Sequence, residues 1–107
     1  MTGNAEDRRA MNPWVPMTRP IDLKHLGKLA EELGELQSAV ARCLIQGIDE
    51  VEPVTGKVNR EWLREEIADV QAGILLAIEH FNLWQTGIDE RRVRKMEQLR
   101  TWHKMLP

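Results

Sequence analysis

The chain is poor in cysteine and in long apolar runs. Cys43 is the only cysteine among the 107 residues, so no disulfide can form within one chain, and its helical apolar setting predicts a buried thiol. The first residues lack the apolar core of a secretion signal, and no later segment has the apolar length of a membrane span. We therefore expect a cytoplasmic protein with no membrane partner.

The chain also lacks a strong excess of one charge. Its 15 basic and 17 acidic residues give a formal net charge of -2. Proteins that bind nucleic acid usually carry a clear basic excess, so we expect no nucleic-acid partner. A chain this short forms one domain, and oligomerisation would help it to bury a sufficient core.

Three prolines predict an irregular arm over residues 1–21, because proline fits only the first turn of a helix. They are Pro13, Pro16 and Pro20. Residues 22–107 form a single predicted domain. Asp22 is the expected N-cap of its first helix, and Gly47 is placed to end that helix as an αL cap.

Apolar residues recur at three- and four-residue steps in three segments, which is the spacing of amphipathic helices. After a loop over 48–58, Asn59 is expected to cap a second helix that stops near Gly87. Asp89 is expected to cap a third helix that ends before Pro107. No segment has a convincing strand pattern. The sequence therefore predicts an all-α fold, a helical bundle completed by oligomerisation.

Two acidic pairs stand inside these helical patterns, Glu32 with Glu35 and Glu66 with Asp69. Residues three apart share one helix face, so each pair lies side by side on the border of an apolar stripe. If the two helices face each other, four carboxylates meet, which is costly unless a cation lies between them. Oxygen ligands suit Mg²⁺ or Mn²⁺, and Mg²⁺ is commonly shared with a phosphate substrate. One isolated pair would more often be a solvated face, but two on paired helices favour metal-dependent phosphate chemistry.

The two motifs, KLAEELGELQSAV at 28–40 and LREEIADVQAGI at 63–74, resemble the EExxE…ExxD signature of the MazG-like all-α nucleoside triphosphate pyrophosphohydrolases. The resemblance covers roughly residues 22–104. It implies Mg²⁺-dependent hydrolysis of a nucleoside triphosphate between its α and β phosphates, and by their chemistry the same carboxylate ligands suit Mn²⁺ as a substitute metal. It also implies a homodimer or a homotetramer. The metal ligands that it implies are Glu32, Glu35, Glu66 and Asp69. Glu31 matches the first glutamate of the motif and is expected to hold a further metal or to orient the attacking water.

The predicted third helix is rich in basic residues that can contact phosphates. Lys95 resembles the family's phosphate-contacting lysine, and Arg100 is a second candidate. Two departures concern the pocket that selects the nucleotide. No asparagine stands near Lys95, and Leu75-Leu76 replaces a polar or aromatic residue of the family. The solvated face of a helix is the ordinary alternative for any single basic residue here.

Four further residues are candidate substrate contacts. Trp62 lies one turn before Glu66 and is placed to stack on a base or ribose, while Trp14 belongs to an arm that could fold over a site. For each tryptophan, burial in a core or an interface is the commoner outcome. His25 and Lys28 lie on the acidic face of the first helix, where Lys28 could instead bridge to a neighbouring glutamate.

Two rival functions remain open. A carboxylate-bridged di-iron bundle would also bury glutamates, but it requires Glu-x-x-His pairs, which this sequence lacks. The other rival is a non-enzymatic helical adaptor or regulator that uses its helices for dimerisation and its acids for solubility. A metal titration separates this adaptor from the enzyme, because only the enzyme needs Mg²⁺ or Mn²⁺.

Overall fold

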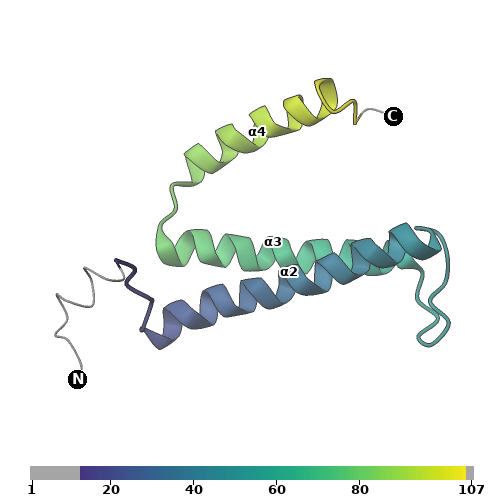
Figure 1. Ribbon diagram of the computed structural model, residues 1–107, viewed down its shortest axis with the longest axis horizontal. Helices are drawn as coiled ribbons and strands as arrows, with labels where there is room; N and C mark the ends of the chain where they lie inside the picture. The colour runs from purple at the N-terminus through teal and green to yellow at the C-terminus, as the bar shows by residue number, and fades with distance from the viewer. Residues whose placement is uncertain (1–12, 106–107) are drawn as a thin grey trace.

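The computed structural model describes residues 13–105, and three helices make up most of them (Figure 1). The helices are α2 (Pro20–Gln46), α3 (Asn59–Phe81) and α4 (Gln85–Thr101). Within the described residues, the only β pairing is an isolated bridge between Val51 and Val58 in the loop that joins α2 to α3. The predicted all-α class is confirmed. None of the described helices is long and apolar enough to cross a membrane.

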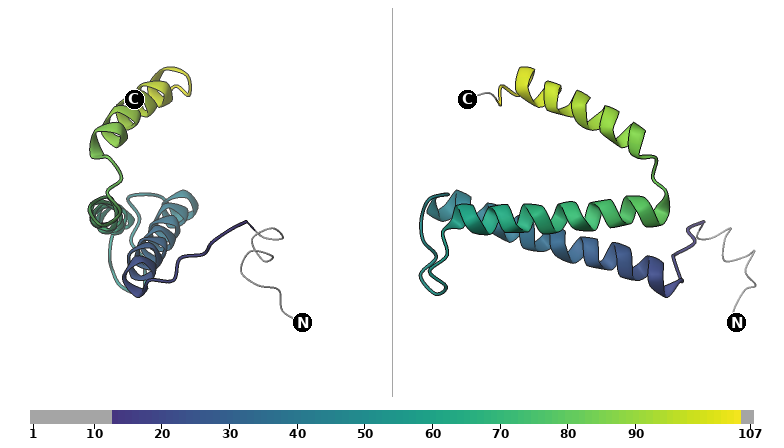
Figure 2. Two further views of the ribbon diagram at one scale, coloured as in Figure 1. Left: turned by 90° about the vertical axis from the view of Figure 1, so that its left-hand side faces the viewer. Right: turned by 180° about the vertical axis from the view of Figure 1, so that it is seen from behind.

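Helices α2 and α3 form an antiparallel hairpin and pack along their length (Figure 2). The buried apolar residues of the described chain are Ala39, Val70 and Ala77, and all three lie in this seam. The helices approach closely at Gly73, where an added Cβ would stand 3.3 Å from Cδ1 of Leu29. Small residues at the seam therefore bring the two helices, and the acids beside them, close together.

Polar contacts fix both ends of the hairpin. At one end Asn59 is 1% exposed, and its Nδ2 donates to Oε1 of Gln46 at 3.2 Å and to the carbonyl of Gly47 at 2.9 Å. At the other end Nε2 of His80 lies 2.6 Å from Oδ1 of Asp22. These contacts set the register in which the acidic pairs of the two helices face each other.

The predicted caps of α2 and α3 are wrong. Helix α2 begins at Pro20 with Arg19 as N-cap, because proline needs no N–H partner in the first turn and has the required φ. Asp22 therefore lies within the helix, and the irregular arm ends two residues earlier than predicted. Val58 is the N-cap of α3, since the Asn59 side chain is already used between the helices. Gly47 does end α2, at φ +108, but its ψ of 140 lies outside the αL region.

The junction between α3 and α4 also differs from the prediction. Helix α3 ends at Phe81, well before Gly87, and Asn82 in the left-handed region is its C-cap. Helix α4 then starts at Gln85, so Asp89 lies inside it and caps nothing. The Asp89 carboxylate instead accepts hydrogen bonds from Gln85 Nε2 and Arg92 Nη1, both at 2.8 Å.

Helix α4 stands apart from the hairpin (Figures 1 and 2). Extensive packing between helices is confined to α2 and α3. The radius of gyration is 19.5 Å, whereas a compact chain of this length has about 13 Å. Large apolar side chains consequently stay exposed on α3 and α4, including Leu75 at 59%, Leu76 at 54% and Val93 at 59%.

Candidate metal centre

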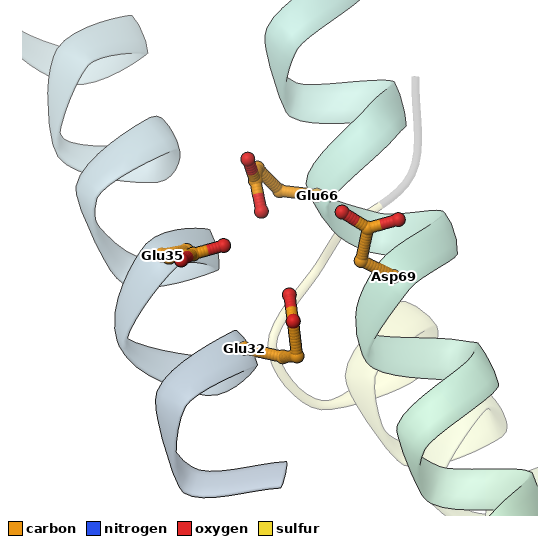
Figure 3. A group of neighbouring side chains, drawn as sticks. All are labelled: Glu32, Glu35, Glu66 and Asp69. Atoms are coloured by element: carbon orange, nitrogen blue, oxygen red, sulfur yellow. The ribbon is translucent and has the colours of Figure 1, made fainter. Parts of the chain in front are cut away.

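Four carboxylates converge between α2 and α3 (Figure 3). Glu32 and Glu35 extend from α2, and Glu66 and Asp69 extend from α3 into the same space. One oxygen from each of the four side chains lies within 4.8 Å of the others. The predicted meeting of the two acidic pairs is therefore confirmed. We call these four residues the acidic cluster.

The hairpin seam explains why the cluster forms. Glu35 precedes the buried Ala39 by one turn, and Glu66 precedes the buried Val70 by one turn. Side chains one helical turn apart lie on the same face, so burying the small residues draws the acids toward the opposite helix. The Glu32 side chain is only 14% exposed as a result.

The cluster holds more negative charge than its protein partners balance. Nζ of Lys28 lies 3.3 Å from Oε1 of Glu32, and Nε1 of Trp62 donates to Oε1 of Glu66 at 3.3 Å. The second oxygen of each of these glutamates, Oε2, is buried and has no hydrogen-bond partner. The negative charge of Glu32, followed by burial and the charge of Glu66, raises the pKa of Glu35.

The donor set fits a hard divalent cation. All four side chains offer carboxylate oxygens, the ligands that Mg²⁺ and Mn²⁺ prefer. The two buried oxygens without partners are groups that a cation would satisfy, and a buried acceptor left alone is costly. A cation between the helices would also relieve the repulsion that raises the pKa of Glu35.

The raised pKa of Glu35 predicts how the stability of the metal-free protein depends on pH. At pH values above the ordinary 4.5, the Glu35 carboxyl keeps its proton more readily in the folded protein than in the unfolded chain. The contribution of this residue to the free energy of unfolding therefore falls as the pH rises through its folded pKa. In EDTA, Glu35→Gln should therefore gain stability relative to the wild type as pH rises from about 4 to 8. Thermal melts of both proteins across this range measure the difference. Parallel curves would show that Glu35 is not under this repulsion.

The two other charged candidates on α2 lie beside the cluster. Glu31 is not among the four convergent residues, and its side chain is 57% exposed. Lys28 lies between Glu31 and Glu32, with Nζ at 3.4 Å and 3.3 Å from their carboxylates. The alternative that Lys28 bridges neighbouring glutamates is thus observed, and these partners raise its pKa, Glu32 most strongly.

Other predicted contacts lie away from the cluster within one chain. His25 stands about 10 Å along the helix axis from Glu32, and its ring stacks on His80 with the ring centroids 4.1 Å apart. Trp14 precedes α2 and is 80% exposed. Lys95 and Arg100 belong to α4, which the hairpin does not contact extensively.

Trp62, by contrast, lies at the cluster, together with Arg42, a cationic residue that was not among the predicted contacts. A cavity of about 360 Å³ opens beside the acids and is lined by Glu35, Ser38, Ala39, Arg42, Trp62 and Glu66. Cζ of Arg42 lies 4.3 Å from the centroid of the Trp62 ring. The signal was present in the sequence, because Arg42 follows Glu35 by two helical turns and so lies on the same face.

The chain matches no protein-family model, no curated protein and no solved structure. The resemblance to the MazG-like enzymes therefore depends on the two acidic motifs alone. The geometry adds an observation that the motifs do not contain, namely that both pairs meet between antiparallel helices.

Proposed function

We propose that the chain is a Mg²⁺-dependent nucleotide pyrophosphohydrolase that cleaves a (d)NTP into the monophosphate and pyrophosphate. The observation that carries the proposal is the convergence of four carboxylates within 4.8 Å, with a buried oxygen of Glu32 and one of Glu66 left without partners. The order and spacing of the acids, EExxE then ExxD, connect this site to phosphoanhydride hydrolysis through the MazG-like resemblance.

In this proposal Glu32, Glu35, Glu66 and Asp69 hold the metal. When bound, Mg²⁺ supplies charge to neutralise phosphoryl oxygens and lowers the pKa of a coordinated water. Glu31 is the catalytic candidate because its exposed carboxylate stands next to the cluster, where it can accept a proton from the attacking water. Lys28 holds Glu31 in place and contributes positive charge near the phosphates.

The proposal includes a helical bundle completed by a second copy of the chain, in a homodimer or homotetramer. The exposed apolar side chains of α3 and α4 support it, as does a radius of gyration half again as large as a compact chain would have. Two-fold symmetry is the commonest arrangement of such oligomers. In it Lys95 and Arg100 on α4 would serve the acidic cluster of the partner, and the arm with Trp14 would cover it.

A non-enzymatic helical adaptor is the alternative function. It also uses the exposed apolar faces for dimerisation, but it gives the acidic cluster no ligand. The two functions differ in their response to metal, because binding to the folded state alone raises the melting temperature. A clear stabilisation by Mg²⁺ or Mn²⁺ supports the enzyme, and indifference to both metals supports the adaptor.

Incubation with each common NTP and dNTP in the presence of Mg²⁺ tests the reaction itself. At least one nucleotide should be consumed, and EDTA should stop the reaction because the phosphate charge is then no longer neutralised. Chromatography measures the loss of each triphosphate. The pyrophosphohydrolase is ruled out if no nucleotide is consumed with either Mg²⁺ or Mn²⁺.

A further inference from the structure

Arg42 is a cation held beside the acidic cluster with its hydrogen-bonding groups unused. Its guanidinium lies over the Trp62 ring, 4.3 Å from Cζ to the ring centroid. It makes no hydrogen bond or ion pair with any residue between 13 and 105. A stacked guanidinium presents its N–H groups at the edge of its plane, where they can reach a ligand.

Two other cations near this end of the hairpin are already paired. Nζ of Lys57 also lies over the Trp62 ring, at 5.6 Å, but it contacts Oε2 of Glu65 at 2.6 Å. Nε of Arg60 contacts Oδ1 of Asp49 at 2.7 Å. Neither of them lines the cavity beside the acidic cluster, whereas Arg42 does. The charge of Arg42 helps to lower the pKa of Glu52, but the two side chains form no hydrogen bond or ion pair.

The cavity is lined by side chains of both charges. Glu35 and Glu66 belong to the acidic cluster, and Arg42 lies against Trp62. A ligand that spans the cavity needs oxygens that share a divalent cation and further negative charge for a guanidinium. A phosphate chain has both properties, and the planar fork of arginine matches phosphate oxygens.

We propose that Arg42 binds the phosphate chain of the substrate from within the same subunit, and that Trp62 is the positioning residue that fixes the guanidinium. Trp62 is suited to this role because its indole N–H also donates to Oε1 of Glu66, and this hydrogen bond holds the ring under the guanidinium next to the acidic cluster. This inference rests on the proposed function. In addition to the basic residues that α4 of a partner subunit would supply, it gives the phosphate chain a contact from the same subunit that holds the acidic cluster.

Calorimetric binding of tripolyphosphate in the presence of Mg²⁺ tests the role of Arg42 without requiring turnover. Arg42→Gln should weaken binding about 10- to 100-fold, the usual effect of losing charged hydrogen bonds. Arg42→Lys should restore only part of the affinity, because a lysine lacks the planar fork. Lys57→Gln is the matched control, since it removes a cation over the same ring that is already paired, and it should bind nearly as the wild type does.

The positioning role of Trp62 is tested by a double-mutant cycle. Trp62→Leu and Trp62→Phe both lose the N–H that donates to Glu66, so the difference between them reports the stacking surface. Trp62→Leu should weaken tripolyphosphate binding more than Trp62→Phe does when Arg42 is present, and the two should bind alike in Arg42→Gln, because the stacking surface acts through the guanidinium. Trp62→Phe should recover part of the loss in the presence of Arg42, since it restores a stacking surface. Additive losses in the double variant would show that Trp62 does not position Arg42.

Three outcomes would overturn the inference, and they separate it from the proposed function. If Arg42→Gln and Lys57→Gln bind tripolyphosphate equally well and the wild type turns over nucleotide, Arg42 does not bind the phosphate chain, but the proposed hydrolase activity stands. A loss of nucleotide affinity without a loss of tripolyphosphate affinity would make Arg42 a contact of the base. A wild type with neither turnover nor Mg²⁺-dependent tripolyphosphate binding would overturn both proposals. If Arg42 contributes to tripolyphosphate binding but the wild type hydrolyses no nucleotide, the phosphate-binding role of Arg42 stands and the proposed hydrolase activity is wrong.

Discussion

Replacing Glu66 with glutamine is expected to abolish Mg²⁺-dependent nucleotide hydrolysis, with a loss of about 10³-fold or more in kcat/KM. The Glu66 carboxylate is one of the four that converge, and its buried Oε2 has no protein partner. A metal centre contributes several kcal/mol to phosphoryl chemistry, and about 4 kcal/mol corresponds to this loss in rate. Steady-state kinetics at saturating Mg²⁺ measure the effect.

Glu65→Gln is the matched control, because it makes the same chemical change one residue away. The Glu65 side chain is 52% exposed and contacts Nζ of Lys57 at 2.6 Å, outside the cluster. Exposed ion pairs of this kind contribute about 0–1 kcal/mol, so activity should stay near the wild type. The metal-free Glu66→Gln protein should be as stable as the wild type or more so, because one clustered charge is removed. Equal activities of the two variants would refute the assignment of Glu66 as a metal ligand.

The second large effect is expected at Leu75, where a glutamate should dissociate the oligomer and abolish turnover. Leu75 lies in the C-terminal half of α3 and is 59% exposed in the single chain, on a helix whose buried side already packs on α2. A charge placed in an apolar interface loses its hydration without gaining a partner, which costs several kcal/mol. Light scattering at low micromolar concentration should show a dimer or tetramer for the wild type and a 12.4 kDa monomer for the variant.

Val54→Glu controls for the introduced charge. Val54 is 89% exposed and belongs to the loop before α3, so the same change there should leave both the oligomer and the activity intact. A wild-type protein that is monomeric and fully active would contradict the oligomer. An oligomer that survives in Leu75→Glu would contradict an interface at Leu75.

Periodicity in the sequence was sufficient to predict the helices and the meeting of the acids. The apolar stripes and the three-residue spacing act locally, and both persist when α2 and α3 pair. The caps were not predictable in this way. Asn59 and Asp22 have the chemistry of N-caps, but their side chains bind Gln46 and His80 from the other helix. Contacts between residues far apart in the chain thus overrode a local preference.

Arg42 was not predicted as part of the site for a similar reason. Arg42 is a plain cation on a helix face in the sequence, and only the pairing of α2 with α3 places it over Trp62. The position of α4 is likewise not set by local signals. Its apolar residues Val93 and Met96 gave the expected helical spacing, yet both remain exposed because the hairpin does not cover them. In the oligomer that we propose, a second chain would give that spacing a packing partner.

Hydrolysis of the preferred triphosphate in heavy-oxygen water, followed by mass spectrometry of both products, tests the central claim most directly. Attack of water on the α phosphorus forms the new P–O bond on the nucleotide and expels pyrophosphate. We therefore expect labelled monophosphate, unlabelled pyrophosphate and no reaction in the Glu66→Gln variant. A nucleoside diphosphate with labelled orthophosphate would mean attack on the γ phosphorus, and it would contradict the pyrophosphohydrolase proposed here.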